Sequence, residues 1–293
     1  MSTFGEVENG SRKTHPSSAH QGGYGSTLTS VKRVSAADDH NPRCRNAMED
    51  AHVFIDEFAK ECGNGTSSAF FGVYDGHGGR KIVEFVEKYL HLNLQKELVE
   101  TNAETLEDVE NAIQTAFLLT DIQTAKANLQ VSGSTATTVL LRKQHTTGAR
   151  YLHAANCGDA RAVLARKGGV AYRLSYDHKA NDAPEKSRIE QAGGFVIRGR
   201  VLGILAVARS FGDHSLKQFV VPTPFVQSVE LREGEDDFLV LACDGVWDVM
   251  EDQEVVDFVK NYAGDFDLAA RALVDEALRR GSTDNITALV VEL

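Results

Sequence analysis

Three acidic segments of this 293-residue chain place an aspartate beside an apolar run that is typical of a buried strand; they lie at residues 69–77, 237–245 and 283–293. The first two are near copies, in which the run ends at Asp75-Gly76 and at Asp244-Gly245, and the third places Asp284 before the run. Carboxylates gathered at strand ends around one cleft repel each other unless cations lie between them. The pattern therefore predicts a metal centre built from oxygen ligands.

The types of ligand indicate which metal this centre would bind. The candidates are carboxylates, carbonyls and water, without the clustered His or Cys ligands that zinc sites use, and this set suits Mg²⁺ or Mn²⁺. The glycine after Asp75 lets the backbone approach closely, so the Gly76 carbonyl could itself be a ligand. Several converging acids indicate two ions, which in two-metal sites lie roughly 3.5–4 Å apart and activate a water.

A further acidic pair, Glu49-Asp50, leads into an apolar run that begins at Val53. Taken alone, such a pair is more typical of ordinary surface charge. Because side chains alternate along a strand, Glu49 and Asp50 would point to opposite faces, and at most one would bind a metal directly. We favour Glu49 as the direct ligand, with Asp50 acting through water or supporting the site.

Two side chains beside these acids could act on a phosphate. Arg45 carries a planar, permanently charged guanidinium group, which can donate two parallel hydrogen bonds to a phosphate. His77 follows Asp75-Gly76 and could be a structural histidine. Beside a divalent ion and a phosphate, however, it is better placed as a general acid.

Three more candidates depend on their surroundings. Thr135 lies in a run of small hydroxyl residues that usually forms turns and caps, and it could support the site. Asp159 lies in a turn between two predicted strands. Either this turn is a simple hairpin, or it places a further carboxylate at the edge of the cleft. Asp248 follows Asp244 by four residues, a spacing that can present both acids to one ion in a turn entering a helix.

The elements that must position these residues are mainly strands. Strands are predicted at residues 27–36, 52–58, 70–75, 136–142, 151–156, 160–166 and 170–174, around residue 238, and at the C-terminal end. Helices are predicted at residues 80–98, 106–125, 184–192, 253–261 and 268–280. Strands outnumber helices and are joined by short turns, so antiparallel sheets flanked by helices, an α+β class, are expected.

The composition limits the function. A net charge of −11 and a pI of about 5.4 disfavour a nucleic-acid surface, and no apolar run approaches the length of a membrane span. The four cysteines form no CxxC pair, which favours a reducing compartment, cytoplasmic or nuclear, with the thiols as small buried hydrophobes. Residues 1–23 are polar and predict a disordered tail, with the ordered domain at residues 24–293.

Together, the motifs resemble the metal-dependent serine/threonine protein phosphatases of type 2C, the PPM family. Each motif is weak alone, but their ordered set, which runs from about residue 24 to the end, is highly specific. The motifs are Arg45…Met48-Glu49-Asp50, Asp75-Gly76-His77-Gly78-Gly79, Ser132-Gly133-Ser134-Thr135-Ala136, Asn156-Cys157-Gly158-Asp159, Asp177-His178-Lys179, Ala208-Arg209-Ser210-Phe211-Gly212-Asp213, Asp244-Gly245-Val246-Trp247-Asp248 and Thr283-Asp284-Asn285.

The resemblance implies a four-layer α-β-β-α sandwich, in which helices flank two central antiparallel sheets and two Mg²⁺ or Mn²⁺ ions lie at one edge. It also implies a role for each site residue. Asp75 would bridge both ions. Glu49 and the Gly76 carbonyl would bind one ion, Asp244 and Asp284 would bind the other, and Asp50 would hold a water. A third, weaker metal position would be formed by Asp159, Asp244 and Asp248. Arg45 would clamp the phosphate and His77 would protonate the leaving oxygen.

The implied activity is hydrolysis of phosphoserine and phosphothreonine in proteins by a metal-activated water. A likeness to compact fungal members implies a monomer that acts on stress-signalling kinases, and a flap at residues 174–198 would influence substrate choice. One alternative is a non-catalytic partner-binding module on the same scaffold, which the complete set of metal acids disfavours. A metal-dependent phosphodiesterase or nuclease is disfavoured by the net charge.

Overall fold

The computed structural model of the protein describes residues 28–59, 68–129, 132–144 and 147–293. The predicted tail at residues 1–23, the predicted start of the domain near residue 24, and Cys62 lie outside these ranges. Within them, no helix combines the length and the apolar character that crossing a bilayer requires.

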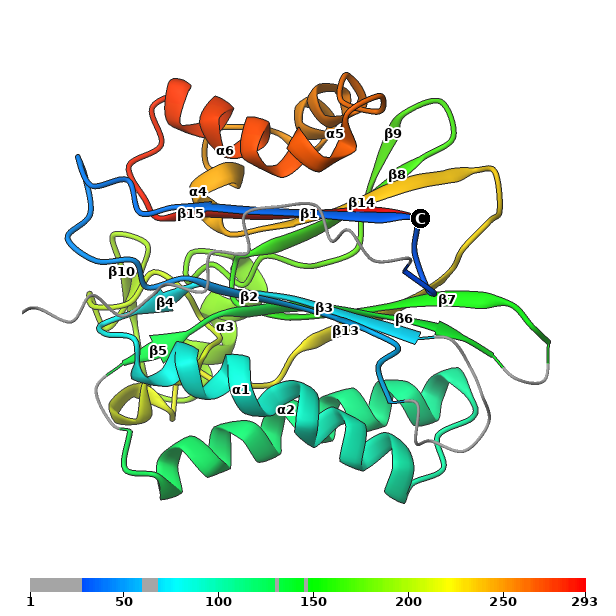
Figure 1. The fold of residues 1–293 in the computed structure, drawn as a ribbon. Helices are drawn as coiled ribbons and strands as arrows, with labels where there is room; N and C mark the ends of the chain where they lie inside the picture. The colour runs from blue at the N-terminus through cyan, green and yellow to red at the C-terminus, as the bar shows by residue number, and fades with distance from the viewer. Residues whose placement is uncertain (1–27, 60–67, 130–131, 145–146) are drawn as a thin grey trace, which may run out of the picture.

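Two five-stranded antiparallel sheets form the middle of the described molecule (Figure 1). The first has the order β1-β15-β14-β8-β9, formed by Arg33–Asp39, Ile286–Glu292, Asp236–Ala242, Arg161–Arg166 and Val170–Arg173. The second has the order β13-β7-β6-β3-β2, formed by Phe225–Glu230, Arg150–Cys157, Ala136–Lys143, Ser68–Tyr74 and Ala51–Asp56. In each sheet, strands that are distant in sequence become neighbours.

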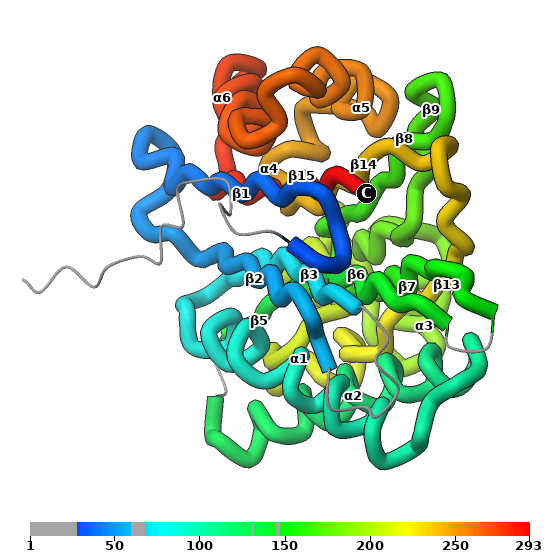
Figure 2. The backbone as a smooth tube through the Cα atoms, turned by 45° about the vertical axis from the view of Figure 1, so that its right-hand side comes forward, coloured from blue at the N-terminus to red at the C-terminus, as the bar shows by residue number. Residues whose placement is uncertain are grey.

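Helices cover the outer face of each sheet, so the molecule has four layers (Figures 1 and 2). Helices α5 and α6, at Asp252–Lys260 and Ala269–Arg279, lie over the first sheet. Helices α1 and α2, at Lys81–Glu100 and Leu106–Lys126, lie over the second. The predicted α+β class, with two central antiparallel sheets flanked by helices, is therefore confirmed.

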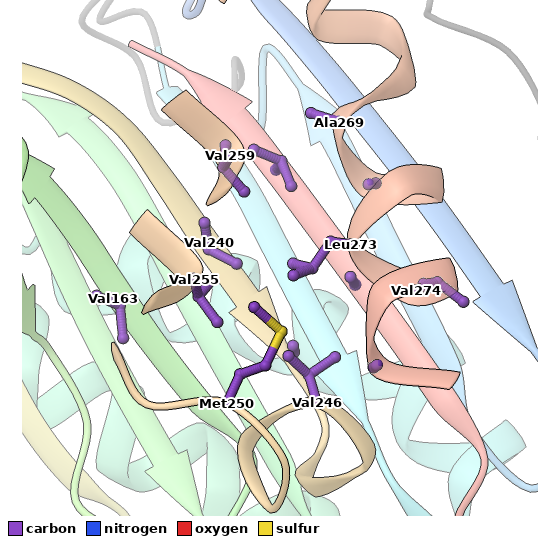
Figure 3. Close-up of a cluster of buried hydrophobic side chains, with 14 of the residues drawn as sticks. Val163, Val240, Val246, Met250, Val255, Val259, Ala269, Leu273 and Val274 are labelled. Carbon is purple, nitrogen blue, oxygen red and sulfur yellow. The ribbon is translucent and has the colours of Figure 1, made fainter. Parts of the chain in front are cut away.

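Three apolar cores separate the four layers, and they explain why the central strands are so hydrophobic. One core lies between the two sheets, one between the second sheet and α1 and α2, and one between the first sheet and α5 and α6. In the last of these, Leu273 and Val274 of α6 pack with Val240 of β14 and Met250 (Figure 3). Because both faces of each sheet are covered, strands such as β3 are buried along their whole length.

Smaller elements gather at one end of the sandwich, which lies at the left in Figure 1. A three-stranded sheet has the order β12-β5-β4, formed by Phe211–Gly212, Gly133–Ser134 and Gly76–His77. Helix α3 at Ala183–Gln191 and the hairpin of β10 and β11, Val196–Ile197 and Arg200–Val201, share a fourth, small apolar core. The remaining short elements are α4 at Asp244–Trp247 and the 3-10 helices η1 at His214–Leu216 and η2 at Phe266–Leu268.

The structure corrects the sequence prediction in three places. The strand predicted at residues 27–36 is β1 at Arg33–Asp39, because that segment pairs in register with β15, from Arg33 opposite Glu292 to Asp39 opposite Ile286. Strand β13 was not predicted, because its half-buried residues follow two prolines. Among the cysteines, Cys157 and Cys243 are buried as expected, but Cys44 is exposed because it lies in a loop at the edge of the first sheet.

Candidate metal centre and phosphate site

Three of the predicted acids meet at the end of the sandwich where the small elements gather. Asp75 follows β3, Asp244 begins α4 just after β14, and Asp159 lies in the connection between β7 and β8. One carboxylate oxygen from each lies within 4.8 Å of the others. Since β7 and β8 belong to different sheets, the turn at Asp159 is not a hairpin, and it brings a further carboxylate close to Asp75 and Asp244.

The two Asp-Gly turns need glycine for the same reason. A Cβ atom on Gly76 would lie 2.3 Å from the backbone oxygen of Glu49, and one on Gly245 would lie 2.2 Å from that of Asn285. Both distances are far inside van der Waals contact. Each turn therefore packs directly against the backbone of another segment of the site, which brings the segments of Glu49 and Asp284 to the acidic cluster.

The clustered carboxyl groups resist ionisation. Burial, followed by the nearby charge of Asp244, raises the pKa of Asp159 to about 8. Burial also raises the pKa of Asp244 to about 6, with repulsion from Asp284 and Asp248, and it raises the pKa of Asp75 well above its ordinary value. A cation among these groups would favour their charged forms.

The donor atoms fit a hard divalent cation. Every side-chain donor in the cluster of Asp75, Asp159 and Asp244 is a carboxylate oxygen, the ligand that Mg²⁺ and Mn²⁺ prefer. The Oδ1 atom of Asp244 is buried and has no hydrogen-bond partner within the described residues. A buried, unpaired carboxylate oxygen is costly, and a metal ion would satisfy it.

Asp50 and Thr135 are both buried near the cluster, and Thr135 is hydrogen-bonded to one of its members. Asp50 is buried, accepts a hydrogen bond of 2.8 Å from the Thr287 hydroxyl, and has its pKa raised to about 7 by burial. The backbone N–H of Thr135 donates to the carbonyl of Asp75 at 2.8 Å, and its hydroxyl accepts from the Asp75 N–H at 3.3 Å. These contacts fit the supporting parts that the sequence suggested for both residues.

Asp248 lies at the exposed margin of the cluster. Its carboxylate pairs with the Lys179 ammonium at 2.9 Å, and its charge contributes to the raised pKa of Asp244. The third metal position at Asp159, Asp244 and Asp248 stays a prediction.

The loop that carries Arg45 and Glu49 is fastened by Asn285, a residue to which the sequence assigned no role. The buried Asn285 amide donates to the carbonyls of His40 and Ala47 at 2.9 and 3.0 Å, and its oxygen accepts from the Glu49 N–H at 2.8 Å. Its place directly after Asp284 in a quoted motif was the only signal available, because its partners lie more than 200 residues away in the sequence.

Arg45 and His77, the two residues predicted to act on a phosphate, both lie at this end of the molecule. The guanidinium of Arg45 pairs with the carboxylate of Asp284 and donates to the Thr283 carbonyl at 3.2 Å. The Nε2 atom of His77 lies 2.7 Å from the Oδ2 atom of Asp213. Asp213 occurs in a quoted motif, but its contact with His77 could not be predicted from that motif.

Comparisons with known proteins agree with this arrangement. A family model described as Protein phosphatase 2C matches residues 35–286. A Schizosaccharomyces pombe protein named Protein phosphatase 2C homolog 1 is 42% identical over 257 residues, covering 87% of this chain and 72% of that protein. A Saccharomyces cerevisiae protein of the same name is 39% identical over 275 residues, covering 89% of this chain and 93% of that protein.

A solved structure supports the fold. Serine-threonine phosphatase 2C from Toxoplasma gondii superimposes with a TM-score of 0.75 at 22% identity, covering 91% of this chain and 96% of that chain. The family model spans most of the chain, and the two yeast relatives match the chain over most of their own length. The chain therefore belongs to the protein phosphatase 2C family of metal-dependent protein-serine/threonine phosphatases.

Proposed function

We propose that this phosphatase hydrolyses phosphoserine and phosphothreonine with a binuclear Mg²⁺ or Mn²⁺ centre held by Glu49, Asp75, the Gly76 carbonyl, Asp244 and Asp284. When bound, the ions would supply an activated water and neutralise charge on the phosphate. The observation that carries the proposal is the meeting of three carboxylates from distant segments, one of which has a buried, unpaired oxygen.

The chain's own residues would bind the phosphate and deliver a proton. Arg45 would turn its guanidinium toward the phosphate oxygens and hold them in line for attack. As the bond from phosphorus to the serine or threonine oxygen breaks, the electron pair stays on that oxygen, and His77 gives it a proton. Thr135 would keep Asp75 in position through its two hydrogen bonds, and Asp50, held by Thr287, would act through a water or support the site.

Replacing the acids that would hold the metal tests the proposal. Asp75→Asn and Asp244→Asn should each lower turnover of a phosphothreonine peptide by at least about 100-fold, since a metal ion contributes several kcal/mol of charge stabilisation and about 1.4 kcal/mol corresponds to tenfold. Calorimetry should show weakened Mn²⁺ binding, while circular dichroism should show an intact fold. Asp257→Asn, on an exposed face of α5, is the control.

Substantial Mn²⁺-dependent turnover by either variant would contradict the metal assignment. A wild-type protein that binds Mn²⁺ but cleaves no phosphopeptide would favour the alternative, a non-catalytic partner-binding module on the same scaffold. Both outcomes can be read from one set of assays.

The natural substrates of this phosphatase are phosphorylated proteins. We propose stress-signalling kinases among them, on the likeness to compact fungal phosphatases, two of which are about 40% identical to this chain. A pull-down with the Asp244→Asn variant as substrate trap should enrich phosphorylated kinases relative to the Asp257→Asn control. Equal recovery with both variants would contradict this choice of substrate.

A further inference from the structure

We propose that Asp213 is a positioning residue for His77: it holds the imidazole through Nε2 so that Nδ1 is the nitrogen that serves the leaving group. This inference rests on the proposed function of His77 as proton donor. The two side chains are 136 positions apart in the sequence and meet at 2.7 Å. Because an ionised carboxylate can only accept, Nε2 keeps a proton in this pair, and the proton that passes to the leaving oxygen is the second one of the imidazolium, on Nδ1.

The small three-stranded sheet is what brings this pair together. In its register, Gly133 of β5 lies opposite His77 of β4 on one side and opposite Gly212 of β12 on the other. Asp213 follows Gly212 directly, so its carboxylate reaches the imidazole over the Gly133 backbone. A Cβ atom on Gly133 would lie 2.1 Å from Asp213 Oδ2 and 2.2 Å from His77 Nε2, so only glycine leaves room for the contact.

Asp213 is itself held in an unfavourable backbone conformation. Its φ of 45° and ψ of 38° lie in the left-handed region, which residues other than glycine adopt at a cost and asparagine and aspartate tolerate best. The Ser210 hydroxyl donates to the same Oδ2 atom at 2.5 Å, and the Asp213 N–H donates to the Ser132 carbonyl at 3.1 Å. Strain maintained by several contacts at one residue is typical of functional sites.

Helix α2 also contacts the segment that carries Asp213. The Asp121 carboxylate accepts from the Gly212 N–H at 2.8 Å and from the Lys217 ammonium at 3.0 Å. Lys217 also donates to the Ser210 carbonyl at 3.0 Å. Asp121 therefore supports the segment without being a hydrogen-bond partner of His77, and it offers a matched control that separates bracing from positioning.

The test compares an alkyl substrate, a phosphothreonine peptide, with p-nitrophenyl phosphate, whose aryl leaving group needs little help from a proton donor. With Mn²⁺ present, Asp213→Asn should lower kcat on the peptide by about 10–100-fold, the usual effect of removing the carboxylate partner of a functional histidine. Turnover of p-nitrophenyl phosphate should change by less than about 3-fold, since proton donation is the step affected. Asparagine is chosen because it tolerates the left-handed backbone.

Two further variants decide between positioning and bracing. The double variant His77→Ala with Asp213→Asn should be no slower on the peptide than His77→Ala alone, because both changes remove one function. Asp121→Asn should keep the wild-type ratio of peptide to p-nitrophenyl phosphate turnover. Equal losses on both substrates, additive losses in the double variant, or a selective loss in Asp121→Asn would each overturn the inference.

A measurement without turnover separates this inference from the proposed function. In ¹⁵N-histidine NMR of the Mg²⁺-loaded protein, with His77→Ala used for assignment, neutral His77 should carry its proton on Nε2, and Asp213→Asn should shift this tautomer balance. A proton on Nδ1 in the wild type would overturn the inference. Wild-type protein that cleaves neither substrate would contradict the proposed function, and the tautomer would still decide the role of Asp213.

Discussion

Four charged residues of the site are each held by a second residue, Asp75 through its backbone and the other three through their side chains. Asp75 has Thr135, Asp50 has Thr287, His77 has Asp213, and Arg45 has Asp284. The last pair joins the predicted phosphate clamp to a predicted metal ligand. A metal ion on Asp284 would compete with Arg45 for that carboxylate, and the guanidinium could then turn to a phosphate.

Arg45 should contribute mainly to substrate binding. Arg45→Ala should raise KM for a phosphothreonine peptide by about 10–100-fold, because a hydrogen bond to a charged group contributes about 1.5–3 kcal/mol. The measurement is steady-state kinetics at saturating Mn²⁺. Arg43→Ala, an exposed arginine in the same loop, is the control. A KM equal to that of the control would contradict the assignment.

The raised pKa values predict how stability depends on pH without metal. Burial raises the pKa of Asp159 from 3.8 to about 8, so the folded protein binds more protons than the unfolded chain between these values. The stability that this group contributes is fully present below pH 3.8 and is lost as the pH rises toward 8.

Urea denaturation in EDTA between about pH 5 and pH 8 measures this dependence. Asp159→Asn removes the group, so its free energy of unfolding should fall less over this range than that of the wild type. Asp257→Asn should keep the wild-type slope, since that side chain is exposed. Identical slopes in all three proteins would show that Asp159 is ionised throughout the range.

At the scale of elements, the two Asp-Gly turns are the parts that fix the site. Gly245→Ala would force a Cβ atom to within 2.2 Å of the Asn285 carbonyl. We expect a loss of about 1–3 kcal/mol in unfolding free energy, as for other overpacked sites, together with weaker Mn²⁺ binding. Gly264→Ala is the matched control, since its Cβ would meet nothing within 4 Å. Equal stabilities of the two variants would mean that the turn can relax at little cost.

Most of the main strands and helices, with β13 as an exception, could be predicted from the sequence because their apolar residues follow a regular pattern. Helix α2, at Leu106–Lys126, differs by one residue from the prediction, and its apolar residues repeat at helical spacing. The two-residue strands β4, β5 and β12 have no pattern of that kind. Their pairing depends on glycines that permit close backbone contact, which becomes visible only when the chain is folded.

The same limit applies to the site. Asp75, Asp159 and Asp244 could be identified because each follows or precedes an apolar strand. Asp213 and Asn285 could not be assigned a role, because their chemistry depends on partners more than 100 residues away in the sequence. Asp248 was placed with Asp244 by helical spacing, but its ion pair with Lys179 could not be predicted, because Lys179 lies 69 positions away in the sequence.

At the scale of the whole molecule, stability and activity should be separable. Leu273 is fully buried between α6 and the first sheet, in a core of apolar residues that contains none of the three clustered acids (Figure 3). Leu273→Ala should lower the unfolding free energy by about 2–5 kcal/mol through loss of packing. Mn²⁺ affinity and KM should stay near wild-type values below the unfolding temperature.

The control for this variant is Leu268→Ala, which lies just before the same helix but is 51% exposed. It should change the unfolding free energy by no more than about 0.5 kcal/mol, as is usual for surface sites. A large change in Mn²⁺ affinity in Leu273→Ala would mean that this core and the metal site are coupled.

The turn at Asp159 passes from one sheet to the other, and the three clustered acids are anchored in both. Asp75 leaves β3 of the second sheet, whereas Asp244 leaves β14 of the first. An ion shared by these carboxylates would therefore cross-link the two sheets of the sandwich. Sliding of one sheet over the other would break the bonds between the ion and its carboxylates. Resistance to such sliding should therefore increase when the metal is bound and decrease when it is removed.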